Sequence, residues 1–184
     1  MRSDDGPLDA AWMDRVVEVA LARRAPALFP DTDALRLLHG ENDGLPGVRA
    51  DAWGEHVVLT LDSPSLEGLV PLLVEALRAR LPVRSVWRCY RPDPRETLDL
   101  GALSTAVVFG EGRREEVVVR ERGLRMAVRP WEGPDVGMYA DMREVRRFLA
   151  PTWAGRRVLN TFAYTGAFSV AAAAGGAARV VSVD

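Results

Sequence analysis

Residues 156–184, RRVLNTFAYTGAFSVAAAAGGAARVVSVD, constrain the fold more than any other part of this sequence. An apolar run is followed by a turn, an alanine-rich segment and a second apolar run, which predicts a strand, a helix and a second strand. Two parallel strands joined by a crossover helix are the building unit of an α/β sheet. The loop after the first strand then lies at the carboxyl edge of the sheet, where the helix N-terminus offers free N–H groups and nucleotides bind.

The turn in this segment lacks the glycines of a dinucleotide-binding turn. A G-x-G-x-x-G turn uses glycine so that the backbone can approach a pyrophosphate, but Phe162 and Tyr164 stand at the first two of these positions and only Gly166 remains. Their bulk disfavours a nicotinamide or flavin dinucleotide. S-adenosylmethionine carries no phosphate, so we predict S-adenosylmethionine as the cofactor, with the aromatic side chains as walls of its pocket. The alternative is an ordinary strand–helix junction of an unrelated α/β fold.

The candidate cofactor-binding residues come from this turn and from the end of the second strand. Residues 158–166 align without a gap to the common methyltransferase turn V-L-D-x-G-x-G-T-G, and the second strand ends on an acidic residue suited to accept hydrogen bonds from both ribose hydroxyls. The predicted residues are Asn160, Phe162, Tyr164, Thr165, Gly166 and Asp184.

The rest of the chain predicts an α+β domain of mixed helices and β-hairpins over residues 1–130. Helical spacing of Leu8, Trp12, Val16, Val19 and Ala20 predicts a first helix, and leucines at helical spacing predict a second over residues 65–81. Between them, residues 34–62 have the short apolar runs and turns of a β-meander. A strand over residues 83–92, a short strand within a loop, and a hairpin over residues 115–130 with its turn at Arg122 and Gly123 complete the domain. A connector with one helix, residues 131–155, leads to the start of a Rossmann-like α/β methyltransferase domain, residues 156–184. Two strands and one helix cannot close a core, so we expect this domain to be truncated after its second strand.

The composition and charge distribution indicate which partners and which compartment suit this chain. All 24 basic residues are arginine, which agrees either with genomic base composition or with phosphate recognition. Residues 1–83 hold 8 arginines against 14 acidic residues and residues 84–184 hold 16 against 12, so the second half is the better candidate to face a polyanion. No apolar run of membrane-spanning length and no signal peptide appear, and the single cysteine excludes an internal disulfide, so we expect a cytoplasmic protein that does not enter membranes.

Three segments, in order, resemble the bacterial large-subunit ribosomal RNA 5-methylcytosine methyltransferases. They are LRLLHGENDGLPGVRADAWGEHVVL, GPDVGMYADMREVRRFL and the closing segment, in which an Asn-x-Phe-x-Tyr-Thr-Gly turn replaces the glycine-rich one. The resemblance implies ribosomal RNA as the partner and places Tyr139, Asp141 and Arg143 around the cofactor pocket. The alternative for these three residues is an exposed helix face with i, i+4 ion pairs. Val136 and Met142 depart from the family, which usually has Thr and Gln there.

The resemblance also implies what this chain lacks. The N-terminal PUA domain of the family has no counterpart here, nor has the later catalytic part with its Asp-Pro-Pro region and cysteine nucleophile, so we assign no catalytic residue and expect the chain alone to be inactive. Cys89 is interpreted as a packing residue, and His39 and His56 as surface or structural residues rather than metal ligands. The turn-rich ENDGLPG segment is interpreted as structural. The alternating charges of RREEVVVRERGLR are typical of a solvated hairpin, and the alternative is that its arginines line an RNA path: Arg113, Arg114, Arg120, Arg122 and Arg125. The alternative function is a non-catalytic RNA-binding or ribosome-assembly module, and the oligomeric state, including a homodimer, is left open.

Overall fold

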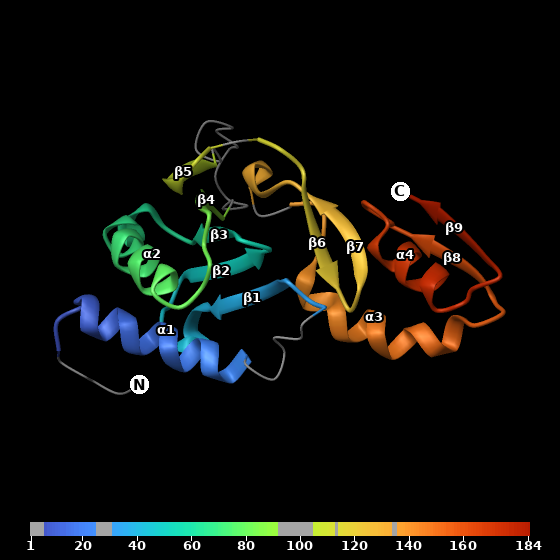
Figure 1. Cartoon of the computed structure of the whole chain (residues 1–184), viewed down its shortest axis with the longest axis horizontal. Helices are drawn as coiled ribbons and strands as arrows, with labels where there is room; N and C mark the ends of the chain where they lie inside the picture. Colours follow the sequence, from blue (N-terminus) through green and yellow to red (C-terminus); the bar gives the residue numbers. More distant parts are fainter. Residues whose placement is uncertain (1–5, 25–30, 92–104, 113, 134–135) are drawn as a thin grey trace.

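The computed structural model describes residues 6–24, 31–91, 105–112, 114–133 and 136–184. A five-stranded sheet with the order β1-β2-β3-β4-β5 forms the N-terminal part of the molecule (Figure 1). Its strands are β1 (Ala34–His39), β2 (Val48–Trp53), β3 (His56–Leu61), β4 (Ser85–Tyr90) and β5 (Ala106–Gly110). All neighbours pair antiparallel except β3 and β4, which are parallel. Short 3-10 helices follow β1 and β3, at Gly40–Asp43 and Pro64–Leu69. The predicted meander and the strand after it are confirmed.

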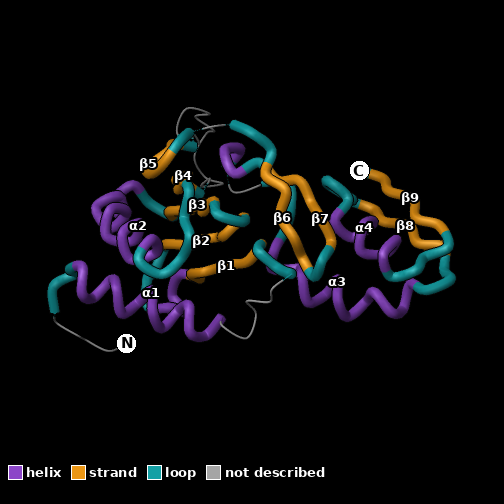
Figure 2. The backbone as a smooth tube through the Cα atoms, viewed as in Figure 1, coloured by secondary structure: helices purple, strands orange, loops and turns teal. Residues whose placement is uncertain are grey.

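Helices α1 (Ala10–Arg24) and α2 (Val70–Arg78) cover one face of this sheet (Figure 2). Helix α2 crosses from β3 to the parallel β4 and carries Pro71 in its first turn, as predicted, where no intrahelical N–H is needed. None of the described helices has the length and apolar content needed to cross a membrane.

Helix α1 exists as predicted, and its buried face was predicted in part, because Ala20 is buried and Trp12 and Val16 pack against the core. The buried side chains are Met13, Val17 and Ala20, whereas Leu8 and Val19 are exposed. The segment has apolar residues on more than one side, so their spacing does not fix the rotation of the helix. Ion pairs fix it instead, because Arg24 donates to the buried carboxylate of Asp43 at 2.6 Å and 3.0 Å.

Asp43 also shows that the ENDGLPG segment is structural. Its carboxylate accepts the His39 backbone N–H at 2.7 Å and a bond from Arg23 at 3.2 Å. Burial by itself would raise the pKa of Asp43, but the hydrogen bonds from Arg24 and from the backbone outweigh burial and lower it. Asp43 is therefore a charged anchor that joins α1 to the 3-10 turn after β1.

The second face of the sheet is covered by the hairpin of β6 (Val117–Glu121) and β7 (Leu124–Val128). Arg122 and Gly123 form its turn, both with positive φ (50° and 79°), as a two-residue hairpin turn of the primed type requires. A second apolar cluster forms between the sheet, the hairpin and the segment after the hairpin. Its buried side chains are Ala34, Trp53, Val58, Trp87, Cys89, Val119, Met126, Val128, Val136 and Met138.

The remaining elements lead to a second, smaller sheet. Short 3-10 helices at Pro130–Glu132, Ala140–Met142 and Ala150–Trp153 flank α3 (Arg143–Leu149), which is shorter than the predicted helix. Strands β8 (Arg157–Thr161) and β9 (Arg179–Val183) are parallel and are connected by α4 (Ala167–Ala174), so the predicted strand–helix–strand unit is confirmed. The hairpin contacts β1 on one side and α4 on the other, so it lies between the five-stranded sheet and this C-terminal unit (Figures 1 and 2).

Candidate functional site

The turn between β8 and α4 has left-handed backbone at every second residue. Phe162, Tyr164 and Gly166 have φ of 58°, 50° and 90°. These are the positions at which a glycine-rich turn carries glycine, so the backbone keeps that conformation although two residues are bulky aromatics. For such residues this conformation is strained, at a cost of roughly 1–2 kcal/mol each. Strain of this kind clusters at ligand-binding sites.

The turn and Asp184 lie at one edge of the small sheet. Thr161 pairs with Val183 in the parallel register, and the N–H of Ala163 donates to the carbonyl of Val183 at 3.1 Å. Asp184 follows Val183 directly, so its backbone lies next to the turn. The carboxyl edge of a parallel sheet is where such folds bind their ligands, and the structure therefore brings the predicted ribose-binding acid to the predicted turn.

Asn160 secures the unit from inside. Its side-chain amide donates to the hydroxyl of Ser169 on α4 at 2.9 Å, and that hydroxyl lies 2.7 Å from the hydroxyl of Ser182 on β9. The three side chains link β8, α4 and β9. The side-chain nitrogen of Asn160 is thus occupied by α4. Its side-chain oxygen and the residues that follow it are the groups left to contact a ligand.

The connector before α3 meets the turn through two contacts. The hydroxyl of Thr165 donates a short hydrogen bond to the carbonyl of Gly137. The rings of Tyr139 and Tyr164 lie 5.6 Å apart, centroid to centroid, at an interplanar angle of 40°. Tyr139 is the connector residue that the structure places beside the turn.

Asp141 and Arg143 lie elsewhere. They line a cavity of about 110 Å³ on the side of β1, together with Arg24, Leu35 and Arg36. Asp141 is close enough to the buried Asp51 for its charge to add to the rise in the pKa of Asp51, which comes mainly from burial. The structure therefore does not bring all three connector residues into one pocket with the turn.

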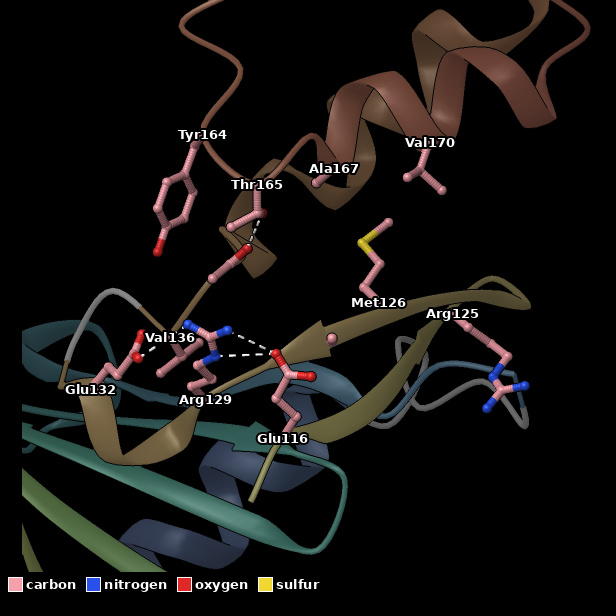
Figure 3. A pocket seen from close by; sticks show the side chains of 12 residues that line it. Glu116, Arg125, Met126, Arg129, Glu132, Val136, Tyr164, Thr165, Ala167 and Val170 are labelled. Atoms are coloured by element: carbon pink, nitrogen blue, oxygen red, sulfur yellow. Dashed lines mark hydrogen bonds and ion pairs between the residues drawn. The ribbon is translucent and has the colours of Figure 1, made fainter. Parts of the chain in front are cut away.

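A groove of about 400 Å³ separates the turn from the hairpin (Figure 3). Tyr164 and Thr165 line one side. On the other side Arg129 lies between two carboxylates, with its guanidinium nitrogens 2.9 Å from Glu116 and 3.3 Å from Glu132. The volume falls within the range of small-molecule sites, and its rim offers both donors and acceptors of hydrogen bonds.

The other candidates take structural places. Cys89 is fully buried, its sulfur lies 3.6 Å from the hydroxyl of Thr60, and burial raises the pKa of its thiol, so it is a packing residue as predicted. His56 accepts or donates a 2.7 Å bond with Ser85, and burial lowers its pKa. Of the hairpin arginines, Arg120 pairs with Asp33 and Arg122 with Glu144.

Sequence reasoning missed Arg146 and Glu121. Both side chains are buried and form a two-bond ion pair, with N–O distances of 2.7 Å and 2.6 Å. No local pattern marks such a pair, because its members are 25 positions apart on different elements.

Comparison with known proteins agrees with this geometry. A family model for S-adenosylmethionine-dependent methyltransferases matches residues 99–184. A ribosomal RNA large subunit methyltransferase of Deinococcus radiodurans is 38% identical over 183 residues, which cover 96% of this chain and 45% of that protein. Ribosomal RNA large subunit methyltransferase I of Erwinia tasmaniensis is 35% identical over 158 residues, 86% of this chain and 40% of that protein. The chain spans less than half the length of these curated relatives.

Two solved structures share the fold over nearly the whole chain. A protein of Streptococcus mutans described as an S-adenosylmethionine-dependent methyltransferase has a TM-score of 0.83 at 28% identity and covers 97% of this chain and 46% of its own. A methyltransferase crystallised with S-adenosylhomocysteine has a TM-score of 0.84, also at 28% identity, and covers 97% and 45%. The prediction of S-adenosylmethionine as the cofactor is thereby confirmed. By sequence this chain is similar to ribosomal RNA large subunit methyltransferases, and by fold it is similar to S-adenosylmethionine-dependent methyltransferases.

Proposed function

We propose that this chain supplies the cofactor-binding turn and the RNA-facing domain of a methyltransferase that modifies large-subunit ribosomal RNA at carbon 5 of a cytosine. The observation that carries the proposal is the turn of alternating left-handed residues at the same sheet edge as Asp184. Backbone held in this way passes close to a ligand without needing a phosphate to fill the turn, as S-adenosylmethionine requires.

The residues divide the work of holding the cofactor. Phe162, Tyr164 and Gly166 shape the turn below the methionine part, and Asp184 accepts hydrogen bonds from the ribose hydroxyls. Tyr139 and Thr165 hold the turn against the connector. When bound, S-adenosylmethionine supplies an electrophilic methyl group, and these residues orient it and exclude water. The family resemblance also assigns Asp141 and Arg143 to this site, although they line the cavity beside β1 and not the groove at the turn.

Titration with S-adenosylhomocysteine tests the cofactor site, using the protein expressed from its complete gene. Hydrogen bonds to a charged group contribute about 1.5–3 kcal/mol each, so we expect Asp184→Ala to weaken binding at least about tenfold, equal to roughly 1.4 kcal/mol. Glu18→Ala, an exposed acid on α1, is the control and should bind as the parent does. Unchanged binding in Asp184→Ala would show that this edge is not the cofactor site.

RNA binding is proposed because some arginines form no ion pair with an acidic side chain. Within the described part of the chain, no ion pair involves Arg125 at the groove or the cross-strand neighbours Arg157 and Arg179. Like charges directly opposite each other on neighbouring strands destabilise a sheet unless an anion lies between them. Phosphates of RNA would supply such anions.

Salt-dependent RNA binding tests this part. Each lost phosphate contact should lower the slope of log affinity against log salt by about 0.7 for single-stranded RNA. We expect Arg125→Ala and Arg157→Ala each to do so, and Arg78→Ala, whose guanidinium is paired with Glu75, to leave the slope unchanged. RNA binding that is tight while methyl transfer is absent from the complete protein would favour the non-catalytic module instead. Nucleoside mass spectrometry of the methylated RNA identifies the product, and any product other than 5-methylcytidine contradicts the proposed target.

A further inference from the structure

Arg146 is the point at which three elements around the cofactor turn meet. Its guanidinium forms the two-bond ion pair with Glu121 at the end of β6, and one of its nitrogens also donates to the backbone carbonyl of Tyr139 at 2.9 Å. The same guanidinium lies over the ring of Phe168 in the first turn of α4, 5.4 Å from the ring centroid. Arg146 thus touches the hairpin, the connector and the helix that follows the turn.

Stability alone is a poor explanation for this buried charge. The side chains of Arg146 and Glu121 are only 2% and 3% exposed, and removing two charges from water costs about as much free energy as their attraction returns. Well-packed apolar residues often replace such pairs without loss of stability. What an apolar side chain cannot replace is the hydrogen bond to the Tyr139 carbonyl, which needs the planar guanidinium fork.

That hydrogen bond lies within two residues of the contacts that hold the turn. Tyr139 carries the ring that packs on Tyr164, and Gly137 provides the carbonyl that accepts the Thr165 hydroxyl. Tyr164 is one of the two aromatic residues held in strained left-handed backbone, and such backbone persists only where its surroundings enforce it. A chain of contacts therefore runs from Glu121 through Arg146 and Tyr139 to Tyr164.

We propose that Arg146, oriented by Glu121, is a positioning residue that holds Tyr139 and through it Tyr164 in the arrangement that binds the cofactor. This inference rests on the proposed cofactor site. It means that the hairpin of the N-terminal domain sets the geometry of the turn in the C-terminal unit, although the hairpin lies outside the cofactor-binding fold.

A second ion pair joins the same two elements and provides a matched control. Arg122 in the hairpin turn lies 3.0 Å from Glu144 on α3. Both side chains are far more exposed than the buried pair, and Glu144 also pairs with Arg147 at 2.7 Å and with Arg143 at 3.4 Å. Loss of this exposed pair loosens the same junction without removing the bond to Tyr139.

Two variants separate positioning from stability. Glu121→Leu combined with Arg146→Met removes both charges together, so we expect the thermal midpoint to stay close to that of the parent. Tyr139→Leu leaves the buried pair intact and removes the stacked ring, which is half exposed. Because a displacement of about 1 Å in a site can cost up to about a hundredfold, we expect both variants to weaken binding of S-adenosylhomocysteine by at least about tenfold. Arg122→Gln with Glu144→Gln should bind as the parent does.

A second readout requires no cofactor. Labelling with 3-fluorotyrosine gives one fluorine resonance for each tyrosine, and the resonances of Tyr90, Tyr139 and Tyr164 are assigned by Tyr→Phe variants. In the Glu121→Leu/Arg146→Met protein, the Tyr139 and Tyr164 resonances should shift or broaden, while the resonance of Tyr90 on β4 stays in place. The control double variant should change none of the three.

The outcomes are distinct. Unmoved Tyr139 and Tyr164 resonances in a folded double variant would overturn the inference, as would shifted resonances with unchanged affinity. If the double variant does not fold, the affinity of Tyr139→Leu decides, and parental affinity would overturn the inference. A parent that does not bind S-adenosylhomocysteine contradicts the proposed function, and the fluorine resonances still decide whether Arg146 positions Tyr164.

Discussion

Replacing Phe162 by glycine should stabilise the fold and weaken cofactor binding. Phe162 is 92% exposed, so loss of its ring forfeits almost no buried apolar area. Its left-handed backbone costs roughly 1–2 kcal/mol, which glycine removes. Glycine adds about 0.5–1 kcal/mol of chain entropy to the unfolded state relative to alanine. Phe162→Gly should therefore be more stable than Phe162→Ala, by up to about 1.5 kcal/mol, because alanine keeps the backbone strain and also lacks the ring.

Thermal and urea unfolding of the two variants measure this difference. For a chain of this size, 1 kcal/mol moves the thermal midpoint by about 2–4 °C. If the exposed ring covers the bound cofactor, Phe162→Gly should also weaken binding of S-adenosylhomocysteine by about fivefold or more, equal to roughly 1 kcal/mol. A glycine variant that is less stable than the alanine variant would refute the argument from strain. A stabilised variant with parental affinity would show that the ring does not touch the cofactor.

Three further predictions concern other parts of the molecule. Cys89→Ser should leave methyl transfer within about tenfold of the parent. Because burial raises the pKa of the Cys89 thiol, the parent should react with a disulfide reagent only on unfolding. A trapped RNA adduct on Cys89 would contradict this prediction. Hydrogen bonds from Arg147 and then Arg122 lower the pKa of Glu144 from 4.5 to about 2, so its stabilising contribution is complete above pH 4.5 and is lost as the pH falls toward 2. Because Glu144 is exposed, this amounts to about 1 kcal/mol or less, and acid titration of Glu144→Gln should lack it. Gly175→Ala should destabilise by about 1–3 kcal/mol through overpacking, because the new methyl group would lie 2.5 Å from the carbonyl oxygen of Ala150; Gly68→Ala, with nothing within 4 Å, is the control in the same unfolding assay.

The elements that sequence predicted best are those with strong local patterns. The strand–helix–strand unit of residues 156–184 alternates apolar runs with turn residues, and the hairpin places Gly123 where a positive φ is needed. Local pattern could not fix the rotation of α1, which depends on Arg24 reaching Asp43, 19 residues later. It could not reveal the burial of Arg146 either, because a charged residue at helical spacing is usually exposed.

The candidate site divides in the same way. Residue types and spacing predicted the turn and Asp184, and the family resemblance implied Tyr139 as a neighbour. They did not show that Phe162 and Tyr164 adopt left-handed backbone, because bulky residues disfavour it and only the surrounding contacts enforce it. The separation of Asp141 and Arg143 from the turn depends on how α3 packs against β1, which lies about a hundred residues earlier in the sequence.

The apolar cluster on the second face of the five-stranded sheet limits how this protein can be recombined with others. Val136 and Met138 of the connector are buried in it beside Trp53 and Trp87, and Ala167 of α4 packs against it. A chimera that exchanges catalytic domains between relatives at residue 130 would leave two tryptophans without their cover. The exchange should succeed only where the hairpin and residues 131–146 come from the same parent. The hairpin and the connector therefore behave as one unit that has to match the domains on both sides of it.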